Sequence, residues 1–199
     1  MSEQIKMNDT AKDKPSLSQL EAELERITYK GKYKRTFRST ISVLIVTAAA
    51  VVLLAFLIFP VFRIYGSSMS PTINEGEIVV TINRRSFERG DVIMLYFNNK
   101  LLVKRVIALP DDWVDIDLSG NVYVNGKMID EPYLIEKMIG ECNLDLPYQV
   151  PGGRYFVMGD NRNSNQDSRS SVIGGISDEQ IVGKVIFRLW PWNKIGVIE

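Results

Sequence analysis

The stretch Tyr65-Gly66-Ser67-Ser68-Met69-Ser70-Pro71-Thr72 separates two parts of the chain whose hydrophobic patterns differ. Before it, the residues from Ile41 to Phe62 are apolar and uncharged. After it, apolar residues alternate with a period of two in short runs between turns, which is typical of β-strands. Because Pro71 prevents a helix from continuing, the stretch predicts that a long helix gives way here to a β-domain.

The apolar run of residues 41–62 is about 22 residues long, enough to cross a ~30 Å hydrocarbon core as a helix. A cleaved signal peptide has a shorter apolar part, of about 7–15 residues, and does not usually follow some forty residues of tail. We expect Pro60 to loosen the last turn. The run is preceded by a basic cluster made up of Lys30, Lys32, Lys34, Arg35 and Arg38.

Basic residues beside a span favour the cytoplasmic side. We therefore expect residues 1–40 to be a cytoplasmic tail, residues 41–62 a single membrane anchor in contact with lipid, and residues 63–199 an extracytoplasmic domain. Within the tail, residues 1 to about 16 are polar and predict disorder. Residues 17–27 carry Leu17, Leu20, Leu24 and Ile27 at helical spacing, which predicts a short amphipathic helix. This helix could lie on the membrane, contact a partner or be marginal alone.

Six runs after Gly66 have the composition of β-strands. Asn98-Asn99 and Asn125-Gly126 predict hairpin turns, and Ser177 with Gln180 predicts a capping box on one helical turn. No alternation of strands and helices occurs, which argues against a parallel α/β fold. The predicted class is mainly β: an antiparallel, curled or barrel-like domain after one transmembrane helix, with residues 115–150 as a smaller insert. The six strands are expected at Glu77–Ile82, Asp91–Phe97, Leu101–Leu109, Asn121–Val124, Arg154–Met158 and Val182–Trp190.

Composition excludes several classes of function. The 24 basic and 24 acidic residues balance, so nothing indicates nucleic-acid binding. The chain has no histidine, which rules out a Ser-His-Asp hydrolase, and its one cysteine, Cys142, has no histidine partner and cannot form an internal disulfide. A zinc site of ordinary type is nearly excluded, whereas a site made only of carboxylates stays open without clustered support. We expect no metal and no cofactor.

A lysine can activate a serine when burial keeps its amine neutral. Lys104 lies inside the apolar run Leu101–Leu109, on the same strand face as Val106 and Ala108. A lysine in such a strand most often reaches solvent past an edge. If its face points inward, desolvation lowers its pKa from ~10.4 by as much as several units. Lys104 is therefore a candidate base, and the serines around Ser68, otherwise an ordinary polar loop, are candidate nucleophiles.

Four blocks in order resemble the bacterial type I signal peptidases, which are membrane-anchored Ser-Lys endopeptidases. Ser68–Thr72 matches the nucleophile motif Ser-Met-x-Pro-Thr at every fixed position. Arg89–Ile93 is similar to the Gly-Asp strand block, Lys104–Pro110 to the block that supplies the base, and Gly159–Arg169 to the Gly-Asp-Asn-Arg…Asp-Ser-Arg loop. The endoplasmic-reticulum branch uses histidine where Lys104 stands, so the resemblance is to the bacterial and organellar branch.

The resemblance implies that Ser68 attacks the scissile carbonyl of a preprotein and Lys104 accepts its proton. The Ser68 N–H would hold the oxyanion, with a second donor near Gly66 left open. Asp160, Asp167 and Arg169 would hold the loop. The preference for small residues at the first and third positions before the cut implies shallow apolar pockets, lined by Phe62, Ile64, Met69 and Val103, for which core packing is the alternative. The implied protein is a monomer that removes signal peptides from exported preproteins.

Two positions depart from the family pattern. Asp111 stands where the family has glycine, which changes the turn after the lysine block. Asn165 stands where the family has a serine that orients the lysine, with Ser164 one place earlier. Either Asn165 is the orienting acceptor, which we expect, or a small backbone shift brings Ser164 into that role.

Two other functions remain as alternatives. A catalytically idle relative, such as an assembly protein, would be expected to lose the serine or the lysine, and this chain retains both. A soluble Ser-Lys self-cleaving repressor is opposed by the apolar span and by the lack of a DNA-binding segment. Trp190-Pro191-Trp192 predicts either a membrane-interface contact or core burial at the end of the last strand.

Overall fold

The structure is a computed structural model that describes residues 16–164 and 166–198. The expected disorder of the first residues lies outside the described part. The chain divides into two compact units between Leu53 and Leu54. The described residues of the first unit are helical, and the second unit contains the strands.

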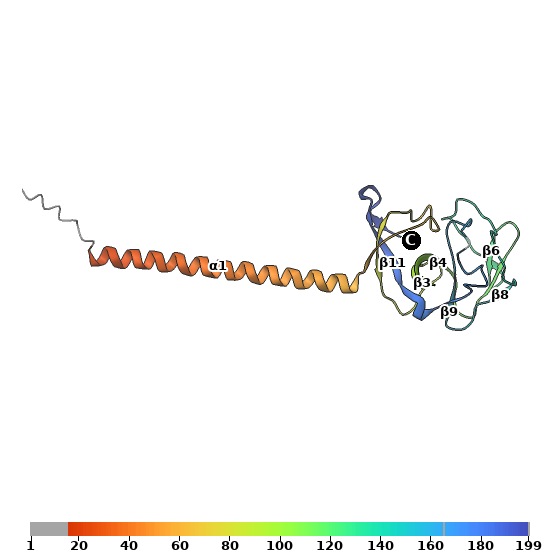
Figure 1. Ribbon diagram of the computed structural model, residues 1–199, viewed down its shortest axis with the longest axis horizontal. Helices are drawn as coiled ribbons and strands as arrows, with labels where there is room; N and C mark the ends of the chain where they lie inside the picture. Colours follow the sequence, from red (N-terminus) through yellow and green to blue (C-terminus); the bar gives the residue numbers. More distant parts are fainter. Residues whose placement is uncertain (1–15, 165, 199) are drawn as a thin grey trace, which may run out of the picture. The chain divides into compact units, whose positions relative to one another are not determined.

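The helix α1 spans Leu17–Ile58 without interruption (Figure 1). The expected amphipathic segment and the expected span are thus one helix, because no proline lies between them. Residues Thr36–Ile58, with a mean hydropathy of 3.0, are long and apolar enough to cross a membrane. The helix ends at Ile58, four residues before Phe62, because the ring of Pro60 disfavours the helical conformation of the residue before it.

Eight antiparallel strands form the larger sheet, and five of the six expected strands belong to it within one residue at each end. The chain of paired strands is open, since it begins with β1 and ends with β10, and β12 pairs with β11; the described strands do not close into a barrel. In order across the sheet the strands are β1 (Val61–Arg63), β2 (Ile78–Ile82), β11 (Ile181–Trp190), β3 (Val92–Phe97), β4 (Lys100–Ala108), β9 (Arg154–Met158) and β10 (Ile176–Ser177), with β12 (Gly196–Val197) beside β11.

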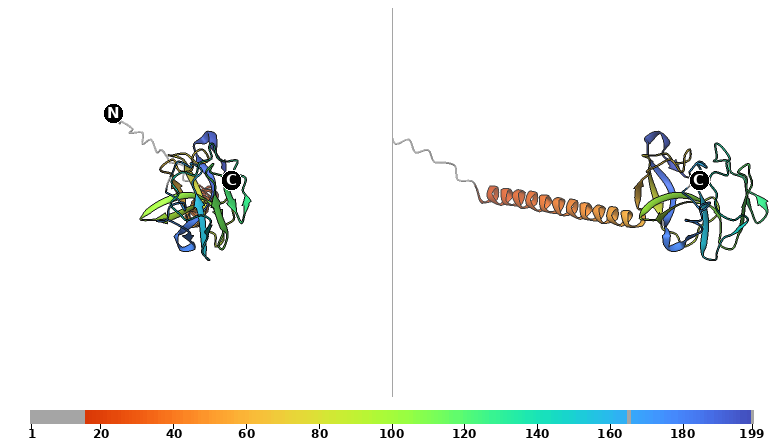
Figure 2. Two further views of the ribbon diagram at one scale, coloured as in Figure 1. Left: turned by 90° about the vertical axis from the view of Figure 1, so that its right-hand side faces the viewer. Right: turned by 45° about the vertical axis from the view of Figure 1, so that its right-hand side comes forward.

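A second sheet of four antiparallel strands corresponds to the expected insert and begins two residues before it, at Trp113. In Figure 1 and in the right-hand view of Figure 2, this small sheet and β11 lie on opposite sides of the β-unit. Its order is β7 (Lys127–Met128), β6 (Val122–Val124), β5 (Trp113–Ile116) and β8 (Tyr148–Gln149).

The expected turns form with the backbone that asparagine and glycine permit. Asn98 and Asn99 have φ of 45° and 62°, and Asn125 and Gly126 have φ of 53° and 76°. Two positive φ values in a two-residue loop match the twist of the strands they join. A 3₁₀ turn at Asp178–Gln180 follows the expected capping box, and a second lies at Trp192–Lys194.

Away from their exposed hairpin end, the strands β3 and β4 are buried on both faces. Val92, Met94 and Val103 pack in one hydrophobic cluster, whereas Ile93 and Val106 pack in another on the opposite face. From Val103 onward every residue of β4 is buried. Both faces of this strand are therefore withdrawn from water, and any charged side chain on it is buried too.

Trp190 and Trp192 are 45% and 76% exposed and pack edge to face, with ring centroids 5.9 Å apart. The alternative of core burial for these tryptophans is therefore wrong.

Candidate active site

Ser68 lies on the loop between β1 and β2, which is anchored by apolar side chains. Met69 and Ile73 are fully buried, and the Ile73 N–H donates to the Met69 carbonyl at 2.8 Å. With the turn from Met69 to Ile73 held in the core, Ser68 lies half-buried beside β4, and its Oγ donates to the Val103 carbonyl at 3.5 Å. Gly66 precedes it with φ of 88°, a conformation that glycine adopts without strain.

Lys104 lies on β4 with 1% of its surface exposed. Its Nζ has no hydrogen-bond partner among the described residues. Burial lowers the pKa of Lys104 from 10.5 to about 8; the Asp167 and Asp160 carboxylates oppose this shift, and the Arg169 guanidinium adds to it. Desolvation is therefore the main reason that Lys104 loses its proton more readily than an exposed lysine does.

Gly159 brings the serine loop and the lysine together. A Cβ at this position would lie 2.5 Å from the Ser68 carbonyl oxygen and 3.5 Å from the Lys104 Nζ. Asn161, two residues later, completes the contact: its N–H donates to the Ser68 carbonyl at 3.0 Å and its side-chain amide to the Ser67 carbonyl at 3.2 Å. Only a glycine leaves room for this approach.

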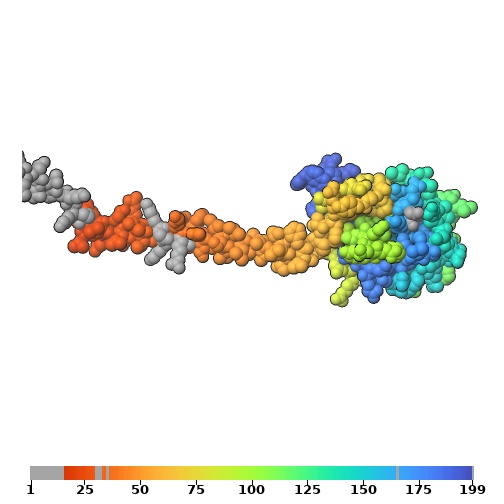
Figure 3. All heavy atoms as spheres, in the orientation of Figure 1, coloured from red at the N-terminus to blue at the C-terminus, as the bar shows by residue number. Residues whose placement is uncertain are grey.

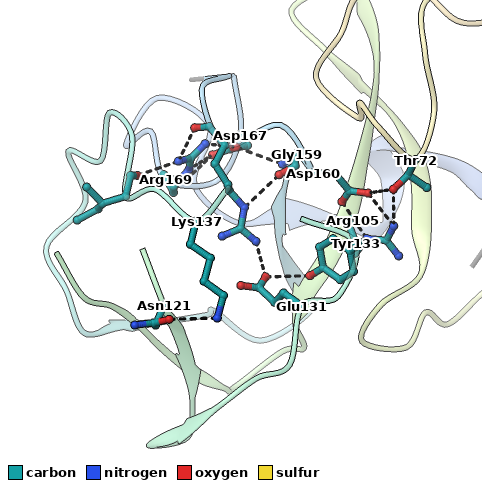
Figure 4. A network of polar contacts seen from close by, with 12 residues as sticks. Thr72, Arg105, Asn121, Glu131, Tyr133, Lys137, Gly159, Asp160, Asp167 and Arg169 are labelled. Carbon is teal, nitrogen blue, oxygen red and sulfur yellow. Dashed lines mark hydrogen bonds and ion pairs between the residues drawn. The ribbon is translucent and has the colours of Figure 1, made fainter. Parts of the chain in front are cut away.

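Asp160 links the loop that carries Ser68 to Arg105, whose side chain lies on the face of β4 opposite to that of Lys104 (Figure 4). Its carboxylate accepts two hydrogen bonds from the Arg105 guanidinium, at 2.9 and 2.7 Å, and a third from the Thr72 hydroxyl. Arg105 also donates to the Gly90 carbonyl at 2.8 Å and lies over the Tyr133 ring, with its Cζ 4.0 Å from the centroid. Such a two-pronged pair fixes orientation as well as position.

Arg169 holds the loop after β9 together and links it to the insert. It pairs with Asp167 through two hydrogen bonds, at 2.9 and 2.8 Å, and donates to the carbonyls of Ile139, Arg162 and Ser164. The Asp167 carboxylate in turn accepts the Gly159 N–H at 3.2 Å. The residues expected to hold this loop thus lie within it, fully buried and fully paired.

A cavity of about 350 Å³ lies beside Ser68. The four residues expected to line apolar subsites, Phe62, Ile64, Met69 and Val103, line it together, and Gly66 and Ser68 lie on its wall. The same residues also pack with the core cluster beneath.

The two positions that depart from the expected motifs, Asn165 after β9 and Asp111 after β4, have different outcomes. Asn165 lies outside the described residues, so its orienting role stays a prediction; the Ser164 carbonyl accepts a bond from Arg169. Asp111 adopts φ of 69°, the left-handed conformation that glycine would adopt more easily, so the turn forms without the glycine.

Sequence reasoning did not identify Arg105, Glu131, Tyr133 and Arg162, which extend the network. Arg162 pairs with Glu131, which accepts the Tyr133 hydroxyl at 2.8 Å. Arg105 carried a signal, because an arginine inside an apolar strand needs an acidic partner. Glu131 carried none, since it comes from the irregular part of the insert. Within residues 16–164 and 166–198, no group of three or more His, Cys, Asp or Glu side chains could hold a metal ion.

Comparison with known proteins gives one family. Residues 36–190 match the model of the family described as signal peptidase, peptidase S26. A signal peptidase I from Bacillus licheniformis is 35% identical over 77% of this chain and 88% of its own length, and a signal peptidase IB from Staphylococcus aureus is 39% identical over 70% and 81%. A solved signal peptidase I from Enterococcus faecalis is 27% identical, with a TM-score of 0.44, covering 51% of this chain and 98% of its own.

Proposed function

Since the chain belongs to the signal peptidase family, peptidase S26, a family of serine peptidases, we propose that it removes signal peptides from exported preproteins as a membrane-bound endopeptidase. Its nucleophile is Ser68 and its general base is Lys104. No cofactor enters the reaction, and the partners are preproteins and membrane lipid.

The burial of Lys104 carries this proposal. The Lys104 amine has no hydrogen-bond partner among the residues that the structure describes and almost no solvent contact, so it is costly to keep charged. Such a group is more often found at sites that need a neutral amine than in a hydrophobic core. Here it lies against the glycine that also touches the carbonyl of Ser68.

The reaction follows from the two groups. The neutral Lys104 amine takes the proton of the Ser68 hydroxyl as the oxygen attacks the scissile carbonyl carbon. The Ser68 N–H stabilises the resulting oxyanion, with a second donor near Gly66. When the intermediate collapses, the Lys104 ammonium gives its proton to the leaving amine and an acyl-enzyme remains. Water then attacks the ester, Lys104 takes its proton, and Ser68 is released with its hydroxyl restored.

The free edge of β4 supports binding of the substrate as an added strand. β4 pairs with β3 over residues 100–105, but β9 begins to pair with its other edge only at Arg105. Alternate residues of a strand direct both backbone groups to the same edge, so Leu101 and Val103 present theirs where β9 is absent. An extended peptide can hydrogen-bond there, next to Ser68 and the cavity of about 350 Å³.

Membrane anchoring by Thr36–Ile58 is supported by the length and hydropathy of this segment. With the basic residues before it on the cytoplasmic side, the β-unit works outside the cytoplasm, where exported preproteins present their cleavage sites. We further infer that the protein acts as a monomer and binds no nucleic acid.

One experiment tests the activity. The detergent-solubilised protein is incubated with a signal-peptide-bearing preprotein, beside the Ser68→Ala protein prepared in the same way. We expect the wild type to release the mature protein and the variant to release none. Equal processing by both proteins, or none by the wild type, would contradict the proposal.

A further inference from the structure

A small cavity of about 170 Å³ lies where the loop that carries Ser68, the loop after β9 and the insert meet. In Figure 3 the yellow segment of residues 66–72, the light-blue loop after β9 and the teal insert come together on the face shown. The cavity is next to Ser68, because the N–H of Asn161, one of its lining residues, donates to the Ser68 carbonyl at 3.0 Å. Six residues that line it are Ser70, Ile135, Glu136, Met138, Asn161 and Asn163.

The strand pairing of β4 decides which part of a substrate reaches this cavity. Substrate residues before the cut follow the free edge of β4 along residues 101–103, beside the cavity of about 350 Å³. From Arg105 onward β9 occupies that edge, so the residues after the cut cannot continue along β4. They therefore leave the sheet beside the loop after β9, where Asn161 and Asn163 line the small cavity.

Two of the charged residues that line the cavity are neutralised by buried partners. Asp160 is paired with Arg105, and Arg162 is paired with Glu131. All four side chains are at most 3% exposed. These two ion pairs add no net charge to the cavity, and their groups are withdrawn from a bound peptide.

Glu136 has the opposite character. It is exposed, and it has no hydrogen-bond or ion-pair partner among residues 16–164 and 166–198. The next residue, Lys137, donates to the Asn121 side chain at 3.1 Å instead (Figure 4). The cavity therefore has one uncompensated negative charge, beside the apolar side chains of Ile135 and Met138.

A lysine or arginine side chain matches this combination, because its apolar stem ends in a positive charge. The volume is below the range of about 300–1,000 Å³ that is typical of small-molecule sites, and it suits a single side chain. We propose that the cavity binds a basic side chain from one of the first three residues after the cut, with Glu136 as the residue that selects it. This proposal rests on the proposed function and adds a preference for basic over acidic residues at the start of the mature protein.

The test uses peptide substrates that are identical up to the cut and have either Lys or Glu at the first, second or third position after it. We expect the detergent-solubilised wild type to show a kcat/KM about fivefold higher for Lys than for Glu at one or more of these positions, as is typical of a partly exposed charge pair. Glu136→Gln should bring this ratio close to one, and Glu136→Lys should invert it. Because Glu136 is exposed, neither substitution disturbs the core.

Glu88→Lys is the matched control. It makes the same change of charge at an exposed residue of the loop between β2 and β3, outside the cavity, and should keep the wild-type ratio. Equal or faster cleavage of the Glu peptides by the wild type overturns the assignment, as does a ratio that Glu136→Lys leaves unchanged or that Glu88→Lys changes equally. These outcomes leave the proposed function intact, since the peptides are still cut in a Ser68-dependent way; absence of any such cleavage overturns both.

Discussion

The protonation of Lys104 gives the sharpest prediction, because the proposed mechanism needs its neutral form. Its pKa of about 8 lies about 2.5 units below the ordinary value of 10.5. This difference corresponds to about 3 kcal/mol. At pH 7 it raises the neutral fraction from roughly 0.03% to roughly 9%, which is about 300-fold.

The assay is kcat/KM for a signal-peptide substrate between pH 5.5 and 10. We expect log kcat/KM to rise with unit slope up to about pH 8 and then to level off, so that activity at pH 6 is about a hundredth of the plateau. Lys104→Arg keeps a charge that cannot be lost, and it should be as inactive as Lys104→Ala. Ser68→Ala defines the background at each pH.

The pH dependence of the free energy of unfolding should also reflect the lowered pKa of Lys104. Because the pKa of Lys104 is lower in the folded chain, the unfolded chain binds more protons between about pH 8 and 10.5, and stability rises with pH through this window. Below pH 8 the buried ammonium costs the folded state about 3 kcal/mol, which Lys104→Met should remove. An acid limb near 10.5, measurable activity of Lys104→Arg, or a Lys104→Met protein with an unchanged stability profile would refute this reasoning.

Three further predictions concern the site and the anchor. Gly159→Ala should lower kcat/KM at least a hundredfold while the domain stays folded by circular dichroism, because its Cβ would lie 2.5 Å from the Ser68 carbonyl oxygen. Gly196→Ala is the matched control, since Gly196 has open space around it. Equal effects of the two substitutions would contradict the packing argument. Asp160→Asn should destabilise the domain by about 3–5 kcal/mol in a denaturant titration, because it leaves the Arg105 charge buried without a partner; a loss below about 1 kcal/mol would argue against the pair. In spheroplasts, external protease should digest the β-unit and spare a tag at the N-terminus, and a protected β-unit would reverse the topology.

Local patterns predicted six of the twelve described strands of the β-unit, including all the long ones. The apolar runs of β2, β3 and β4, and the asparagine turns between and after them, act over a few residues, so the sequence specifies them directly. The strand β1 was not predicted, because three residues after a proline carry too short a pattern. The helix was expected in two pieces because its polar and apolar parts differ in composition, yet backbone hydrogen bonding continues through both.

The candidate base could be predicted from the sequence, because few residue types in this chain can accept a proton from a serine. With no histidine, a lysine in an apolar strand was the remaining base for Ser68, and Lys104 is buried as that reasoning required. The partners of Arg105 were not predictable, because Asp160 and Tyr133 lie 55 and 28 residues away in sequence. Asp160 approaches only when β9 pairs with β4, and Tyr133 only when the insert packs on the sheet. The close approach at Gly159 depends on the same tertiary packing.

The burial of Lys104 also ties the proposed activity to the completion of folding. While the chain is being made, or when it is partly unfolded, this lysine meets water and keeps the proton that an ordinary lysine keeps. Under the proposed mechanism the base would become competent only once folding has buried the amine beneath β4 and the glycine that follows β9. A nascent or partly unfolded copy would then lack a working base, so that hydrolysis of neighbouring chains would begin only after the domain has folded.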